Sequence, residues 1–450
     1  MTRFPTTSWR NSGEPNPKNK AGTGTGAQLS GVEIRPFGLT DDPEAELDLS
    51  RRSFGPISPA HRAASIAGTQ RSVEAGEILG AFDGRLLVGS ARFHPMRQWW
   101  QGRSMPMAGV AGVKVAPEYR GRGVGRALMT GLIAEIAGRG YPVSTLYPAT
   151  APLYRSLGWE AAGGKYETTV PMQLLSRLVA PDPAAGRAGE RSEDPPGLRR
   201  ATAADAAIVA ETLGQVYGAL RDRGAATHDP AYIAAWLDDE DHFAYLADDG
   251  FLSYRWADRR DSVRVEVLAA ASAATARAFW QLLGSHATMT DEVRACLAPD
   301  DPVRWLTTEP VDAVRQVWGW MLRLIDVPAA LEARGFPASV EASVQFELSD
   351  DVLPANAGRW RLEVSGGAGK LARVGPLDPA GSGNMAGSGS TAGGPDAVLR
   401  LGARGLAALY AGVPLGTLRQ AGLAGGGGQA SDDALDSAFG GRPAFMLHAF

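Results

Sequence analysis

VAGVKVAPEYRGRGVGRALMTGLIAEI, residues 110–136, is the stretch that decides the fold of the first part of the chain. An apolar strand over 107–117 runs into a turn where glycine and arginine alternate, and apolar residues at helical spacing follow over 124–140. Glycine lets backbone N–H groups approach an anion without a Cβ in the way, and a helix N-terminus adds unpaired donors and a favourable dipole. The arginines add cationic donors. The segment therefore predicts a strand–turn–helix unit that binds a pyrophosphate group.

The order of residues in this turn separates it from two other phosphate-binding motifs. It does not fit the Rossmann pattern G-x-G-x-x-G, because Arg126 stands where a glycine is required. Gly369-Lys370 is not part of a Walker A motif, since no Ser or Thr follows the pair. A strand, then V-A-P-x-x-R-x-x-G-x-G, then a helix is instead the acyl-CoA-binding pattern of the GNAT superfamily (Gcn5-related N-acetyltransferases), which residues 31–170 resemble. The alternative is a tight turn with surface arginines.

Composition narrows the class of protein. The chain has 450 residues and a formal net charge of −4, which gives no electrostatic reason to expect nucleic acid or a membrane as partner. Cys296 is the single cysteine, so an intrachain disulfide framework and a thiolate cluster are excluded, and the residue is interpreted as a buried thiol. The scattered histidines form no zinc-helix pair, so no metal is expected. Neither a membrane-spanning apolar run nor a signal-peptide core is present, which predicts a cytoplasmic location.

Three low-complexity stretches divide the chain. Residues 1–30 are expected to form a disordered tail, residues 181–197 have the Pro, Gly and charge mix of an interdomain linker, and residues 378–396 are expected to form a mobile loop. The first two breaks and a further boundary before Gly319 leave three folded segments, predicted over 31–180, 198–318 and 319–450.

The first two segments show the same order of elements. Segment 31–180 alternates strand and helix signals, which predicts an α/β layer architecture, and within it Asp83-Gly84 predicts a hairpin over 77–96. Segment 198–318 ends in a strand that runs into a helix over 263–287, without a glycine–arginine turn between them. We therefore interpret the second segment as a structural relative of the first that lacks its cofactor site.

The third segment has a different pattern. Residues 320–336 predict a strand followed by a helix. The stretches 340–350, 358–364 and 397–402 alternate like strands of an antiparallel sheet. Trp318 and Trp320, at the start of this segment, are expected to pack at a domain junction.

Within the GNAT superfamily, the chain resembles the Eis (enhanced intracellular survival) acetyltransferases over nearly its whole folded length. The resemblance is carried by VKVAPEYRGRGVGR, YPVSTLYPATAPLYRSLGW, LRLIDVPAALEARGF and an apolar C-terminus ending in Ala449-Phe450. It implies an α/β (α+β) fold in which an active GNAT domain is followed by a degenerate GNAT-like domain and a C-terminal domain similar to sterol carrier proteins.

The resemblance also implies which residues bind the co-substrate, acetyl-CoA. The strand before the turn matches the splayed strand that hydrogen-bonds the pantetheine arm, the turn matches the phosphate site, and the end of the next strand matches a further cofactor contact. The implied residues are Val113, Lys114, Val115, Arg120, Gly121, Arg122, Gly123, Val124, Gly125, Arg126, Ala149 and Thr150.

Tyr154, in APLYRSLGW, matches the general acid of the family. A physical argument supports the same role, because a departing CoA thiolate needs a proton and a tyrosine with a pKa of about 10 still carries one at neutral pH. The alternative is a core aromatic on a short amphipathic helix, since Leu153, Leu157 and Trp159 are apolar.

The resemblance implies an unusual general base, the main-chain carboxylate of the last residue, here Phe450. An ammonium substrate must lose a proton before it can attack. The neighbouring residues 445–447 are too apolar for a free tail, which supports docking of the chain end. The alternative is ordinary packing of a terminal strand.

Together these features predict direct acetyl transfer, in a ternary complex, from acetyl-CoA to a primary amine. The resemblance implies small-molecule or peptide acceptors of the aminoglycoside or lysine kind, and a homohexamer. The rival hypothesis is a protein that senses acetyl-CoA or carries lipid without turnover.

Overall fold

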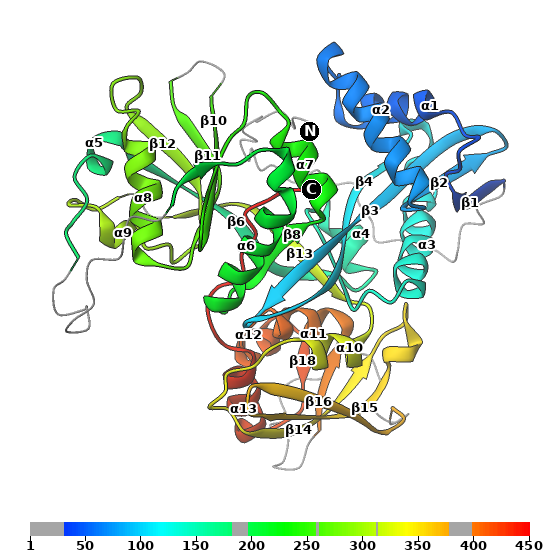
Figure 1. Cartoon of the computed structure of the whole chain (residues 1–450). Helices are drawn as coiled ribbons and strands as arrows, with labels where there is room; N and C mark the ends of the chain where they lie inside the picture. The colour runs from blue at the N-terminus through cyan, green and yellow to red at the C-terminus, as the bar shows by residue number, and fades with distance from the viewer. Residues whose placement is uncertain (1–30, 182–196, 258–260, 312–313, 378–397) are drawn as a thin grey trace, which may run out of the picture. The chain divides into compact units, whose positions relative to one another are not determined.

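The computed structural model describes residues 31–181, 197–257, 261–311, 314–377 and 398–450. The predicted tail 1–30, most of the linker 181–197 and the predicted loop 378–396 lie outside these residues. The chain forms two compact units, labelled by element in Figure 1. The described part of the first unit is 31–94 with 110–135, and the second contains 95–109 and the chain from 136 onward. Strands β3 (Leu86–Trp100) and β4 (Arg103–Val115) pass from one unit into the other.

The first unit packs helices against a small sheet. Its strands follow the order β1-β2-β3-β4. β2 pairs antiparallel with β3 across Asp83-Gly84, which confirms the predicted hairpin, and Gly84 adopts the left-handed φ of +57° that the tight turn needs. The bounds of the elements in this unit are β1 (Val32–Pro36), β2 (Ile78–Asp83), α1 (Pro43–Phe54), α2 (Pro59–Glu74), the 3₁₀ turn η1 (Pro117–Tyr119) and α3 (Val124–Gly138).

Apolar side chains from both sides of the turn hold this unit together. Val124, the first residue of α3, is buried with Ala116 from the end of the strand and with Phe82 and Val88 of the hairpin. On the same helix Gly131 lies close to Ile34 of β1, where an added Cβ would come within 3.2 Å of that side chain. The strand end and the helix start are therefore fixed, and the turn between them faces solvent.

The second unit contains a long mixed sheet. Its strands follow the order β5-β13-β6-β12-β11-β10-β9-β7, and β8 pairs with the last residues of β3. β13 pairs antiparallel with both β5 and β6, so the strand that the sequence placed at the start of the third segment belongs to this sheet. The bounds are β5 (Val143–Leu146), β6 (Glu160–Pro171), β7 (Arg199–Arg200), β8 (Arg223–His228), β9 (Phe243–Ala247), β10 (Gly250–Trp256), β11 (Val263–Ala270), β12 (Glu292–Cys296) and β13 (Arg315–Leu324).

Amphipathic helices cover this sheet. In α6, Val209, Leu213 and Val216 recur at helical spacing and are all buried. In α8, Phe279 and Trp280 fill the core of the second GNAT-like segment, where the predicted buried thiol of Cys296 is confirmed. The helices are α4 (Ala151–Arg155), α5 (Met172–Leu175), η3 (Ala203–Asp205), α6 (Ala206–Ala219), α7 (Pro230–Leu237), α8 (Ala273–Gly284) and α9 (Val303–Leu306).

The last part of the chain forms a five-stranded sheet with helices α10–α12 over one face of β14–β16 (Figure 1). The strand order is β16-β15-β14-β17-β18. β14, β15 and β16 are antiparallel as predicted, but the expectation was wrong for β17, which runs parallel to β14. β17 lies on the opposite side of β14 from β15 and enters the sheet from the same end as β14. The elements are α10 (Val327–Ala333), β14 (Ala342–Ser349), η4 (Pro354–Asn356), β15 (Gly358–Ser365), β16 (Ala368–Gly375), β17 (Leu399–Gly402), α11 (Ala403–Tyr410), α12 (Leu415–Gln420), β18 (Ala424–Gly425) and α13 (Gln429–Phe439).

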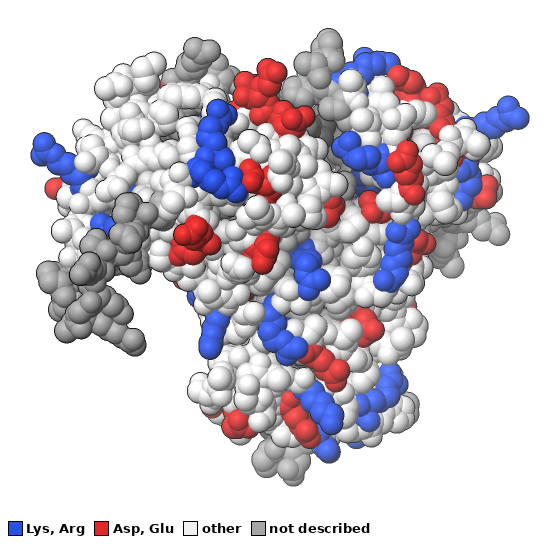
Figure 2. Space-filling model, viewed as in Figure 1, with Lys and Arg blue, Asp and Glu red and all other residues white. Residues whose placement is uncertain are grey.

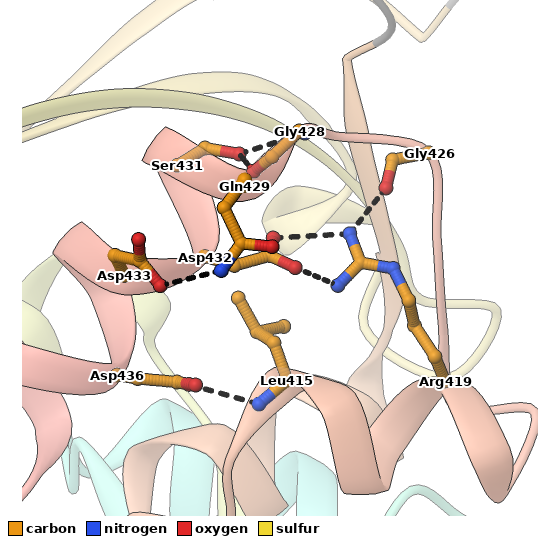
Figure 3. A network of polar contacts seen from close by, with 9 residues as sticks. All are labelled: Leu415, Arg419, Gly426, Gly428, Gln429, Ser431, Asp432, Asp433 and Asp436. Atoms are coloured by element: carbon orange, nitrogen blue, oxygen red, sulfur yellow. Dashed lines mark hydrogen bonds and ion pairs between the residues drawn. The ribbon is translucent and has the colours of Figure 1, made fainter. Parts of the chain in front are cut away.

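Polar contacts tie α12 to α13 (Figure 3). Asp436 accepts from the Leu415 N–H at 2.8 Å and so satisfies one of the unpaired donors at the start of α12. Arg419, at the other end of α12, pairs with Asp432 and donates to the Gly426 carbonyl. Over this part of the molecule basic and acidic side chains lie side by side in Figure 2, as expected for such pairs.

Trp320 and Trp318 differ in environment although they lie on one strand. Trp320 is fully buried among Trp100 and the apolar residues of the last segment, as expected. Trp318 is 46% exposed, and its ring lies 5.9 Å from that of Tyr147. Among the described residues, no helix is both long enough and apolar enough to span a bilayer.

Candidate active site

The glycine–arginine turn of the first unit is open to solvent. Gly121 and Gly123 have left-handed φ values of +75° and +87°, and a Cβ added to either would meet no described atom within 4 Å. The Gly123 carbonyl accepts the Ala127 N–H at 3.0 Å, which closes the first turn of α3. The N–H groups of residues 124–126 precede the first intrahelical donor and are therefore available to a ligand. This geometry fits a pyrophosphate at the helix N-terminus.

Two of the turn arginines are held by the turn itself. Arg120 donates from Nε to the Val115 carbonyl at 3.2 Å, and the Arg122 guanidinium lies 5.2 Å from the centre of the Tyr119 ring. The Tyr119 hydroxyl in turn donates to Asp83 at 2.7 Å. Arg120, Arg122 and Arg126 are all exposed. Anchored but solvent-facing guanidinium groups suit recognition of phosphate oxygens, because little freedom is lost when they bind.

Lys114 has a role that the sequence did not suggest. Its ammonium is buried and contacts the Glu46 carboxylate at 2.6 Å and the Ser50 hydroxyl at 2.6 Å, while Arg92 donates to the same carboxylate at 2.6 Å. Burial alone would raise the pKa of Glu46, but Lys114 and Arg92 outweigh it and bring the value to about 2. Burial lowers the pKa of Lys114 to about 8, although Glu46 opposes the shift. The Lys114 side chain is thus committed to a buried ion pair with Glu46.

The remaining predicted site residues lie in the second unit. Ala149 and Thr150 are exposed in the loop after β5, and Thr150 is the N-cap residue of α4. Tyr154, on α4, is 5% exposed and lies edge-to-face with Trp159 at a centroid distance of 6.3 Å. Burial raises the pKa of Tyr154 to about 12, so the hydroxyl keeps its proton at neutral pH. Among the described residues, no hydrogen-bond partner of that hydroxyl is found.

Phe450 is docked, not free. Its ring lies 5.7 Å from that of Tyr147, and it approaches Gly109 of β4 so closely that a Cβ there would come within 2.9 Å of it. The Tyr147 hydroxyl donates to the His448 carbonyl at 2.9 Å. Tyr147 and Gly109 belong to the first predicted segment, so the chain end packs against it within the second unit.

Main-chain hydrogen bonds fix the residues before Phe450. Phe445 forms a parallel bridge with Gly164 of β6, the Met446 N–H donates to the Gly164 carbonyl at 3.0 Å, and the Phe445 N–H donates to the Arg223 carbonyl of β8 at 2.9 Å. Gly163 leaves room for this tail, since a Cβ there would come within 2.6 Å of the Ala444 carbonyl. The tail runs from α13 past these strands to the C-terminus beside α7 (Figure 1).

The predicted site residues thus divide between the units. Val113 to Arg126 form one group in the first unit, and Ala149, Thr150, Tyr154 and Phe450 lie in the second. Sequence reasoning missed the residues that hold the tail, among them Tyr147 and Gly164. Only the placement of Tyr147 just before the Tyr154 helix could have drawn attention to one of them.

Comparison with known proteins agrees with this architecture. Models of the acetyltransferase (GNAT) domain match residues 33–162 and 217–324, and a model of the sterol carrier protein domain matches residues 327–447. The chain is 34% identical to N-acetyltransferase Eis of Mycobacterium tuberculosis over 314 residues, which cover 67% of this chain and 74% of that protein. An uncharacterised N-acetyltransferase of Streptomyces griseus is 29% identical over 335 residues, covering 68% and 75% of the two chains.

Solved structures extend the likeness over most of the chain. A GCN5-related N-acetyltransferase from Kribbella flavida is 41% identical with a TM-score of 0.81, covering 93% of this chain and 98% of that one. Eis1 from Mycobacterium abscessus has the same fold, with a TM-score of 0.69 at 24% identity over 93% of this chain and 100% of that one.

The fold and the turn therefore define an acetyltransferase of the GNAT superfamily, with two GNAT domains and a C-terminal sterol-carrier-like domain. GNAT acetyltransferases use acetyl-CoA as co-substrate. With a relative at this identity and coverage, the chain belongs to the Eis family of N-acetyltransferases, which act on amine acceptors.

Proposed function

We propose that this protein transfers the acetyl group of acetyl-CoA directly to a primary amine while both substrates are bound. The acceptors are small molecules or peptides of the aminoglycoside or lysine kind. In the reaction a C–N bond forms, the thioester C–S bond breaks, the amine proton passes to a base and the CoA sulfur receives a proton from an acid.

The turn after β4 binds the pyrophosphate of acetyl-CoA through the N–H groups at the start of α3 and the guanidinium groups beside it. The main chain of Val113, Lys114 and Val115 binds the pantetheine arm, and Ala149 and Thr150 make a further contact. The open φ > 0 glycines and the exposed arginines support this part of the proposal.

Tyr154 is the general acid in this proposal. Its raised pKa of about 12 keeps the proton in place until a strongly basic atom lies beside the hydroxyl. A CoA thiolate, with a pKa of about 8.5 for a free thiol, is a weaker base than the tyrosinate. The hydroxyl therefore donates a hydrogen bond to the sulfur while negative charge builds there as the C–S bond breaks, passes it the proton as CoA leaves, and is reprotonated from water.

The main-chain carboxylate of Phe450 is the general base. The single observation that carries this assignment is the docking of the chain end, with Phe450 against Gly109 and Tyr147 and with hydrogen bonds from Gly164 and Tyr147 behind it. These contacts hold the Phe450 ring and the main chain of the residues before it, and so limit where the carboxylate attached to them can lie.

The test is turnover of acetyl-CoA with a panel of primary amines, followed by release of free thiol. One glycine added after Phe450 moves the carboxylate by about 3.5 Å and should lower kcat at least ~100-fold, while acetyl-CoA binding by calorimetry stays within about twofold. Tyr154→Phe should lower kcat by about 100-fold. A glycine inserted after Gly387, in the low-complexity stretch 378–396, is the matched control for lengthening the chain.

The rival hypothesis, an acetyl-CoA sensor or lipid carrier, gives different results. It predicts acetyl-CoA binding without thiol release for any amine, and a Tyr154→Phe variant that behaves like the unaltered protein. Unchanged turnover in the extended protein would refute the carboxylate as base and leave the acetyl transfer itself standing.

The proposal includes the domain limits 31–180, 198–318 and 319–450, a homohexameric assembly and a cytoplasmic location. Light scattering on the purified full chain tests the assembly, with a mass of six chains expected at micromolar concentration. A mass of one or two chains at every concentration would contradict it.

A further inference from the structure

The tail that ends in Phe450 begins at an arginine with an unusual set of partners. Arg442 donates from Nε and Nη2 to both oxygens of Asp300, at 2.6 and 2.7 Å, and it pairs through Nη1 with Asp222. Nη1 also donates to the Leu220 carbonyl at 3.3 Å. This forked geometry fixes both the position and the direction of the guanidinium.

The main chain of the same residue is held as well. Arg223, whose side chain is buried, donates from Nη1 to the Arg442 carbonyl at 3.0 Å. Gly441 lies so near that a Cβ there would come within 3.3 Å of Arg223 Cδ. Both the side chain and the main chain of Arg442 are therefore held by hydrogen bonds, three residues before the Phe445 bridge to Gly164.

The partners of Arg442 all come from the second GNAT domain. Asp222 precedes β8, and Asp300 lies in the loop after β12. Asp301, next to Asp300, is also buried. Burial raises the pKa of Asp222 to about 7 although Arg442 opposes the shift, and burial raises that of Asp301 to about 7 as well. Arg442 thus opposes the effect of burial on these two carboxyls and favours their ionised forms.

We propose that Arg442 is a positioning residue, and that its ion pairs with Asp222 and Asp300 set the register of the tail and so place the Phe450 carboxylate. The inference rests on the proposed role of that carboxylate as base. The second GNAT domain then has a function in catalysis, because it holds the chain end that supplies the proposed base. A displacement of about 1 Å at a reacting group can cost ~100-fold in rate, so a register change at Arg442 reaches the reaction eight residues further on.

The first measurement is hydrogen exchange of the full-length protein, in the peptide that covers 443–450. Phe445 and Met446 donate their N–H groups to Arg223 and Gly164, so their exchange reports on the seating of the tail. In Arg442→Gln we expect these amides to exchange at least ~10-fold faster, with the peptide over β14 unchanged. Unchanged exchange in the tail peptide would overturn the inference, whatever turnover does.

The second measurement is turnover. Arg442→Gln should lower kcat by about 10- to 100-fold while KM for acetyl-CoA stays within about twofold. Arg442→Lys keeps the charge without the fork and should recover part of the loss. Asp300→Asn, a milder change at a half-exposed residue, should shift exchange and kcat in the same direction. Arg359→Gln, which breaks a comparable ion pair with Glu347 in the last domain, is the matched control and should change neither.

A double variant separates positioning from stability. Arg442→Gln with Asp222→Asn also replaces the buried carboxyl that has lost its partner, and should restore the melting temperature, while tail exchange stays fast and kcat stays low. Recovery of kcat together with stability would overturn the positioning role. Fast tail exchange with an unchanged kcat would instead refute the Phe450 base of the proposed function and leave the anchoring of the tail by Arg442 intact.

Discussion

The two GNAT domains place different chemistry at the same point of the fold, where a strand leads into a helix. In the first domain β4 leads through η1 and the left-handed Gly121 and Gly123 into α3. In the second, β11 leads into α8 through Ser272, whose φ of −107° is ordinary extended backbone. The Ser272 hydroxyl accepts the Thr275 N–H at 3.2 Å.

Charge follows the same division. Arginines line the first junction, whereas at the second the Thr275 hydroxyl donates to the carboxylate of Asp249. A carboxylate near a helix N-terminus stabilises the helix and repels an anionic ligand. The second junction has thus satisfied internally one of the N–H donors that the first leaves open. The second junction therefore differs from the first in more than its lack of glycine. Its own side chains cap the start of the helix, at the place where a ligand would bind.

The strands before the two junctions also differ. β4 carries Lys114, buried with Glu46 and Arg92 on the adjoining elements of the first unit. β11 carries Val263, Val265 and Val267, all fully buried in apolar surroundings. β11 also carries Glu266, which pairs with His242 at 2.7 Å and with Arg255. Charge therefore contributes on both strands, but only β4 buries a cationic side chain of its own, Lys114.

The largest expected effect comes from breaking the charged core of the first unit. Glu46→Gln leaves Lys114 and Arg92 buried without a counter-charge and should destabilise the protein by about 4 kcal/mol. Chemical denaturation followed by circular dichroism measures the change. Adding Lys114→Met should recover more than half of the loss, because the double variant buries fewer unpaired charges. Equal stability of the single variant and the unaltered protein would mean that this ion pair does not hold β4.

The contribution of the same ion pair to stability should depend on pH. The pKa of Glu46 falls from 4.5 to about 2 on folding, so its contribution is present above pH 4.5 and is lost as pH falls towards 2. The difference corresponds to about 3 kcal/mol. Denaturation at pH 6 and at pH 3 should therefore show a smaller gap between the unaltered protein and Glu46→Gln at the lower pH. A constant gap would contradict the lowered pKa.

A single carboxylate introduced at the first junction should make it disfavour an anion, as the second junction does. Gly123→Asp places a negative charge where we propose that the pyrophosphate binds and a Cβ at a φ of +87°, and should weaken acetyl-CoA binding by ~100-fold or more. Calorimetry measures the affinity. Ser272→Asp is the matched control, since it introduces the same residue as a good N-cap at the second junction and should leave binding unchanged. An equal loss of affinity in both variants would argue against a site confined to the first turn.

The sequence predicted a structural feature correctly where the feature depends on neighbouring residues in the chain. Asp83-Gly84 and the turn around Gly123 carry their geometry in the residues themselves, and both were predicted correctly as turns. The parallel pairing of β17 was not, because a strand's alternation does not say from which end the chain enters the sheet. The place of β13 beside β5 and β6 depends on partners more than 100 residues earlier in the chain, with no local trace.

The same limit applies to the site. Tyr154 and Phe450 could be named from motif and position. Nothing in the sequence distinguishes Arg442 from the other arginines, and only the structure shows its pairs with Asp222 and Asp300. Lys114 shows the converse, since its place beside the cofactor turn suggested a ligand contact and its ammonium is directed to Glu46. The fate of a charged side chain is decided by its tertiary neighbours.

The smallest expected effect tests whether the second junction is only a helix cap. Ser272→Ala removes the hydroxyl that accepts the Thr275 N–H and should cost about 1 kcal/mol, with no change in acetyl-CoA affinity or turnover. Ser272→Gly should cost only a few tenths of a kcal/mol, because glycine leaves water free to reach the same N–H. Thermal denaturation ranks the two variants. If Ser272→Gly created a second acetyl-CoA equivalent per chain in calorimetry, the capping serine alone would be what separates the two domains. We expect one equivalent, since the carboxylate of Asp249 and the absence of arginines in this turn still disfavour an anion there.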